Sequence, residues 1–132
     1  MTEVDQREFS RIRLMRAIKA TREGSLLENC QLRDISMANA FLSVPEAASV
    51  GLSDVLHLEL EIITPERPLH IEVKAEVVRL DRHGAAVRFI EMDLESLNDL
   101  YSLILMYHDS QNIVRAEFFG KRSQSCCATS YV

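Results

Sequence analysis

The chain has 132 residues, 47% of them hydrophobic and 27% charged, which is enough for one hydrophobic core but not for two independent domains. Its net charge of −5 argues against a nucleic-acid-binding protein, so no DNA or RNA partner is expected. No stretch approaches the roughly 18–20 apolar residues that cross a bilayer, and the charged N-terminus does not resemble a signal peptide. We therefore expect a cytoplasmic protein without membrane insertion.

The first informative segment is Arg7-Glu8-Phe9-Ser10-Arg11, which carries two guanidinium groups four positions apart. Each guanidinium is a planar fork of donors that suits phosphate oxygens or the O6/N7 edge of guanine. Residues 1–12 are predicted to form a flexible N-terminal arm that carries this motif. From residue 7 to residue 22 the chain has six basic side chains and one acidic side chain, which favours a small dianionic ligand. A solvated, basic strand face is the alternative reading.

Six short strands are predicted from alternating apolar and polar residues between turn signals, over residues 13–22, 26–35, 39–44, 56–62, 69–80 and 85–90. The number and spacing of these strands predict a mainly β protein, a small six-stranded antiparallel barrel over residues 13–92. Cys30 lies within this alternation, whereas Cys126 and Cys127 are neighbours in a polar tail. No cysteine spacing suggests a disulfide framework or a zinc site, so free thiols are expected.

A second motif, Asp34-Ile35-Ser36-Met37-Ala38-Asn39, ends the returning strand of the first hairpin. The Asp34 carboxylate can accept hydrogen bonds from guanine N1–H and N2–H₂. Ser36 lies two residues further on, so in a continuous strand its hydroxyl would share a face with Asp34 and support it.

The C-terminal part changes to a helical period. One apolar face is predicted for a helix that begins near Asp93, which is a suitable N-cap. The residues of this face are Leu94, Leu97, Leu100, Tyr101, Ile104 and Leu105. The helical segment is expected within residues 93–119, packed over an open side of the barrel, and residues 120–132 are expected to be disordered.

The two motifs, an RxxxR segment followed by D/N-x-S-x-x-G and an all-β pattern, resemble the PilZ domain family. The resemblance covers roughly residues 6–108 and includes apolar and strand positions beyond the motifs. These are Ile12, Leu14, Ala75, Val77, Val78, Arg79, Gly84, Val87 and Phe89.

The resemblance implies a receptor for cyclic di-GMP, with Arg7 and Arg11 holding phosphate and a guanine edge while Asp34 and Ser36 read the guanine. It further implies an adaptor whose arm becomes ordered on binding and passes the signal to an unidentified protein partner, with no enzymatic activity and no cofactor. The alternative is a PilZ-like protein-interaction module that does not bind nucleotide.

Asn39 stands where the family usually has the glycine of the SxxG motif. We include it in the predicted ligand-binding set. If the position requires positive φ, asparagine is the non-glycine residue that best preserves the loop. If the position requires space for the ligand, the side chain weakens the site.

The remaining polar residues suggest no metal centre and no catalytic site. His57, His70, His83 and His108 show no ligand spacing with cysteines or carboxylates. Four glutamates alternate strictly with apolar residues and are predicted to lie on the solvent face of two strands; these are Glu59, Glu61, Glu72 and Glu76. Arg79 could stack on a guanine, although a solvated strand-end cation is the commoner role.

Overall fold

A computed structural model describes residues 11–45 and 49–107 of the chain. The predictions for Arg7, the N-terminal arm before residue 11, the two tail cysteines and the segments after residue 107 lie outside the described residues. The described elements are β1 (Ile12–Ala17), β2 (Lys19–Arg22), β3 (Ser25–Leu27), β4 (Gln31–Ile35), β5 (Asn39–Ser43), β6 (Val55–Ile62), β7 (Leu69–Asp81), β8 (Gly84–Met92) and α1 (Leu94–Tyr107).

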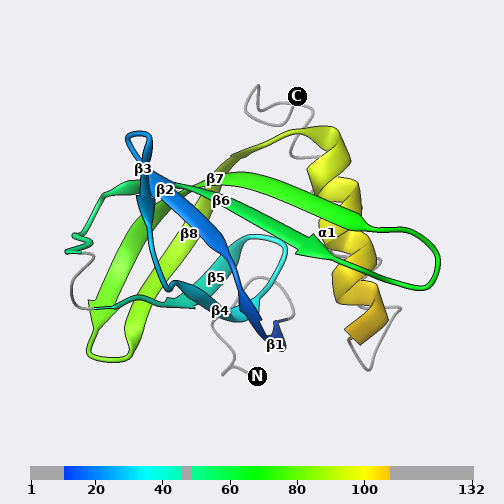
Figure 1. Cartoon of the computed structure of the whole chain (residues 1–132), viewed down its shortest axis with the longest axis horizontal. Helices are drawn as coiled ribbons and strands as arrows, with labels where there is room; N and C mark the ends of the chain where they lie inside the picture. The colour runs from blue at the N-terminus through cyan, green and yellow to red at the C-terminus, as the bar shows by residue number, and fades with distance from the viewer. Residues whose placement is uncertain (1–10, 46–48, 108–132) are drawn as a thin grey trace, which may run out of the picture.

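All strand pairs are antiparallel, in the order β1-β4-β5-β8-β7-β6-β2-β3, and the curved sheet forms a half-barrel with α1 at one end (Figure 1). The mainly β class and the C-terminal helix are thereby confirmed. Among the described residues, no helix is long and apolar enough to cross a membrane.

The predicted count of six strands was wrong, because each strand of the first hairpin is divided in two. The outgoing strand breaks at Ile18 into β1, which pairs with β4, and β2, which pairs with both β3 and β6. The returning strand breaks between β3 and β4, where Asn29 has a φ of 65° and turns the chain. One backbone hydrogen bond of 3.3 Å, from Ile18 N–H to the Cys30 carbonyl, still joins the outgoing strand to the returning strand at these breaks.

The inner face of the half-barrel carries the predicted apolar positions. On β6 these are Leu56, Leu58, Leu60 and Ile62, none more than 3% exposed. The matching residues of β7, from Leu69 to Val77, are also buried, which confirms the period of two in both strands. Cys30 is a buried free thiol, as predicted, and burial raises its pKa.

Helix α1 begins where its cap was predicted. The Asp93 carboxylate accepts the Ser96 N–H at 2.7 Å, which is the hydrogen bond expected of an N-cap. The buried face differs from the prediction at two positions: Leu94 is 44% exposed, whereas Leu103 is fully buried. Leu94 lies in the first turn, before the helix reaches the core.

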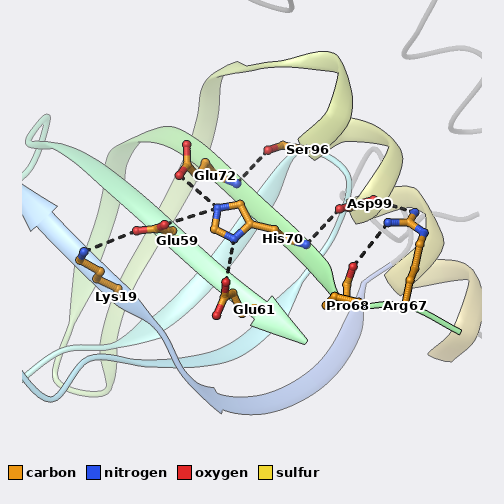
Figure 2. Close-up of polar contacts among 9 residues, drawn as sticks. All are labelled: Lys19, Glu59, Glu61, Arg67, Pro68, His70, Glu72, Ser96 and Asp99. Atoms are coloured by element: carbon orange, nitrogen blue, oxygen red, sulfur yellow. Dashed lines mark hydrogen bonds and ion pairs between the residues drawn. The ribbon is translucent and has the colours of Figure 1, made fainter. Parts of the chain in front are cut away.

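The helix covers the part of β7 that β8 leaves unpaired. Strand β8 pairs with β7 only from Val73 to Asp81. Just before this stretch, the His70 N–H donates to Asp99 Oδ2 at 2.9 Å and the Glu72 N–H donates to Ser96 Oγ at 2.9 Å. Two side chains of α1 therefore accept the backbone hydrogen bonds that a neighbouring strand would otherwise accept (Figure 2).

Replacing Asp99 with alanine is expected to lower the free energy of unfolding by about 1–3 kcal/mol, because the His70 N–H loses its acceptor. Asp99 also pairs with Arg67 at 2.8 Å, so Arg67→Ala is the matched control, and its loss should be much smaller because the Arg67 side chain is exposed. Urea unfolding of both variants measures the difference. Equal losses would show that the exposed ion pair, and not the strand contact, fastens the helix.

Candidate functional site

The candidate site lies where β4 ends and β5 begins, beside the residue that precedes β1. Strand β4 contains a bulge: Leu32 pairs with Leu42 and Asp34 pairs with Phe41, so Arg33 is an extra residue. Without it, alternation would direct Asp34 toward the core. The bulge instead leaves Asp34 half-buried and places Ile35 in the core at 3% exposure.

Arg11 and Asp34 are joined directly. Arg11 Nη1 donates to Asp34 Oδ1 at 3.0 Å, and the two side chains are 22% and 24% exposed. Among residues 11–45 and 49–107, no hydrogen-bond partner faces the buried Arg11 Nε, and an unpaired buried guanidinium donor is costly. The site therefore holds a charged pair at its surface.

Ser36 lies past the end of β4, so the expectation that it shares a strand face with Asp34 was wrong. Its side chain is 1% exposed. Its Oγ accepts the Ala38 N–H at 3.2 Å and the Asn39 N–H at 3.0 Å, and its own N–H donates to the Asn39 carbonyl at 2.8 Å. Ser36 thus shapes the turn between β4 and β5 and does not offer its hydroxyl to solvent.

Two further contacts hold this turn. The Met37 side chain is fully buried, and the Ala38 carbonyl accepts the Phe89 N–H of β8 at 2.9 Å. The backbone between Asp34 and Asn39 is consequently fixed from the core side and from the next strand.

Asn39 is the first residue of β5 and is half-buried. It is not among the residues with positive φ in the described part of the chain, so a left-handed conformation is not what this position requires. Of the two readings made from the sequence, the one based on positive φ therefore does not apply to Asn39, and the one based on space for a ligand stays a prediction. The asparagine side chain occupies volume that a glycine would leave open.

An aromatic platform adjoins the site. Phe41 pairs with Asp34 on one side and with Ala86 on the other, and Ala86 pairs with Arg79. Arg79 Cζ lies 5.9 Å from the centroid of the Phe41 ring, within the range of a cation–π contact. Sequence reasoning missed Phe41; its place two residues after Asn39 on a strand was the available signal.

The basic residues that follow Arg11 are of two kinds, exposed side chains and side chains that form ion pairs. Arg13 and Arg16 are exposed on β1. Lys19 lies 3.6 Å from Glu59, and Arg22 binds Asp54 and the Ser49 carbonyl, each at 3.0 Å. These last two cations fit the reading of a solvated, ion-paired strand face, whereas Arg11 is set apart by its place beside Asp34.

Of the predicted site residues, the structure brings Arg11, Asp34, Ser36 and Asn39 together around one turn. Arg7 lies outside the described residues. Arg11 and Asp34 alone expose their charged groups there, while Ser36 supports the backbone and Asn39 borders the site.

The model of the PilZ domain family matches residues 5–105 of the chain. No curated protein sequence matches this chain. Among 14 similar chains of solved structures is the Bacillus subtilis inhibitor of motility, MotI/DgrA, with a TM-score of 0.66 and 15% sequence identity. The match covers 80% of this chain and 53% of that one, so the chain spans about half of that protein's length.

The fold and the match together define a PilZ-fold domain of the receptor and adaptor class. The chain belongs to the PilZ domain family, and the resemblance seen in its motifs is confirmed. At the level of the family, it is a PilZ protein of the cyclic di-GMP-binding type.

Proposed function

We propose that this protein is a cyclic di-GMP receptor that acts as a signalling adaptor. The observation that carries the proposal is the Arg11–Asp34 pair, in which a guanidinium and a carboxylate lie 3.0 Å apart and are both partly exposed to solvent. Arg7 and Arg11 would hold phosphate oxygens and the O6/N7 edge of a guanine, and Asp34 would accept N1–H and N2–H₂. Such a ligand supplies acceptors for arginine and donors for aspartate at once.

The other residues of the site have supporting roles in this proposal. Ser36 keeps the turn in the conformation that presents Asp34. The Phe41 ring lies opposite Asp34 on the neighbouring strand, with Arg79 over the ring, and a planar base could stack there. Asn39 limits how closely the ligand approaches the backbone, so Asn39 lowers affinity relative to glycine.

Signalling would follow when the ligand also binds Arg7, which lies four residues before Arg11 in the sequence. A ligand held by both arginines fixes the intervening backbone at a cost of about 1–2 kcal/mol per residue. Charge-assisted hydrogen bonds contribute roughly 1.5–3 kcal/mol each, so several formed together exceed that cost. The segment fixed in this way would then form the surface to which a protein partner binds.

Titration calorimetry with cyclic di-GMP tests the proposal. Arg11→Ala is expected to weaken binding roughly 10- to 100-fold, corresponding to the loss of one charge-assisted hydrogen bond or more. Arg16→Ala is the matched control, because it removes the same charge from an exposed position on β1, the strand that follows Arg11, and leaves Asp34 its partner. Absence of binding heat with the wild-type protein would refute the proposal.

Amide NMR during the same titration separates a receptor from the alternative interaction module. A receptor is expected to show shifts at Arg11 and from Asp34 to Asn39. A spectrum that does not move at saturating nucleotide supports the module and contradicts the receptor.

A further inference from the structure

A second cluster of charged side chains lies on the outer face of β6 and β7, away from the candidate nucleotide site. The His70 imidazole lies among three carboxylates, those of Glu59, Glu61 and Glu72, and Lys19 of β2 borders the cluster (Figure 2). The glutamates do lie on the solvent side of their strands, as predicted. Their convergence on one histidine was not predicted.

The distances within the cluster are close to those between the ligands of one metal ion. His70 Nε2 lies 3.1 Å from Glu72 Oε2 and 3.4 Å from Glu59 Oε2. One ligand atom from each of these three residues lies within 4.8 Å of the others. In a tetrahedral zinc site with bonds of roughly 2.0–2.2 Å, neighbouring ligand atoms are about 3.3–3.6 Å apart.

The second nitrogen of the His70 imidazole, Nδ1, also has the kind of neighbour that a metal-bound histidine usually has. His70 Nδ1 lies 3.2 Å from Glu61 Oε2, so Glu61 can accept the Nδ1 proton and direct Nε2 toward the other two carboxylates. A carboxylate that orients a histidine in this way is the usual outer partner of a metal-bound imidazole. Lys19 contacts Oε1 of Glu59, which leaves Oε2 facing Nε2.

The backbone holds these ligands in place. Glu59 lies directly opposite Glu72 in the β6–β7 pair, and Glu61 lies opposite His70. Like charges directly opposite each other destabilise a sheet, and a cation between them removes that penalty. The N–H groups of His70 and Glu72 are fixed by α1, so both residues are held on a rigid part of the molecule.

We propose that Glu59, His70 and Glu72 bind one divalent transition-metal ion, and that Zn²⁺ suits them best. One imidazole and two carboxylates supply three ligands of a tetrahedral zinc site, and water from the solvent side supplies the fourth. The ion would link β6 to β7 beside the start of α1. This site is independent of the proposed nucleotide site.

Calorimetric titration of the full chain with Zn²⁺, with nucleotide absent, tests the inference. The hydrogen bond that the His70 ring donates to Glu72, and after it the one donated to Glu61, raise the pKa of His70, so the titration is run at pH 8 to limit competition by protons. The tail thiols of Cys126 and Cys127 are a competing zinc ligand pair, so every measurement is repeated in a Cys126→Ser/Cys127→Ser background.

One zinc equivalent is expected to persist in the serine background and to disappear with His70→Ala. His83→Ala is the matched control, because His83 is an exposed histidine in the turn between β7 and β8, outside the cluster, and zinc binding should be unchanged. Glu61→Gln is expected to weaken binding roughly 10- to 100-fold. Circular dichroism of the metal-free variants verifies that each one folds.

Thermal unfolding gives a second readout, since zinc that binds only the folded state raises Tm with its concentration. The rise should be present in the serine background and absent in Glu59→Gln/Glu72→Gln, whose substitutions are at half-buried surface positions. Zinc binding that is absent from the wild type, survives His70→Ala or disappears with the two cysteines would overturn the inference.

Discussion

Gly84→Ala is expected to lower the free energy of unfolding by about 3 kcal/mol or more, the largest effect of any single substitution considered for this domain. A Cβ at this position would lie 2.0 Å from the Leu42 carbonyl oxygen and 3.2 Å from the Ser43 Cα. Both are backbone atoms of β5, so no side chain can rotate away to make room. The φ of 153° adds strain for any residue with a side chain.

The close approach follows from the register of the central strands. Ala85 of β8 pairs with Leu42, and Gly84 closes the turn from β7. In that turn the Asp81 carboxylate accepts the N–H groups of His83 and Gly84, and these hydrogen bonds lower its pKa. A shift of Gly84 would therefore disturb the turn and the β5–β8 pairing together.

Gly24→Ala is the matched control for this prediction. Gly24 also has positive φ, at 81°, but a Cβ there meets nothing within 4 Å. Its cost should be only that of the left-handed conformation, about 1–2 kcal/mol. Chemical denaturation of both variants measures the difference, and losses of equal size would show that the contact with Leu42 is relieved by a small backbone movement.

Ser36→Ala is expected to be the second most damaging change, with an effect on both stability and nucleotide binding. The substitution removes the acceptor of the Ala38 and Asn39 N–H groups, and because both donors are only part-buried, their joint cost is roughly 1–3 kcal/mol. Because the turn positions Asp34, cyclic di-GMP binding should weaken although Ser36 itself is buried.

Denaturant unfolding and calorimetric titration of the same Ser36→Ala sample measure the two effects. Ser43→Ala, at the opposite end of β5, is the control for loss of a serine hydroxyl from this strand and should change neither quantity by much. A variant that is destabilised yet binds with unchanged affinity would contradict the positioning role. Full stability with weakened binding would instead indicate that the hydroxyl contacts the ligand.

The parts of the fold that depend on local pattern were predictable from the sequence. The alternation in β6 and β7, the turn before Gly84 and the N-cap at Asp93 each depend on residues close together in the chain. The division of the first hairpin was not predictable in this way. It arises because β2 pairs with β6, more than 30 residues later in the chain, and no local pattern encodes that contact.

The same distinction applies to the candidate site. The motif residues were found by their types and spacing, but the bulge at Arg33 changed what those positions do. The bulge directs Asp34 outward, and the end of β4 at Ile35 leaves Ser36 in the turn, so a strict alternation assigned Ser36 to the wrong environment. The cluster around His70 could have been anticipated by aligning β6 with β7 across their turn, which pairs Glu61 with His70 and Glu59 with Glu72.

The break at Ile18 also has a consequence for how the domain folds. Because β1 pairs with β4 and β2 pairs with β6, the first segment of the chain connects opposite ends of the strand order. Contacts so distant in sequence raise the contact order and delay closure of the sheet until the later strands have formed. Arg11 directly precedes this segment and binds Asp34 of β4, so the candidate site forms on the β1–β4 side of the break, whereas the β2–β6 side can pair only after β6 has been made.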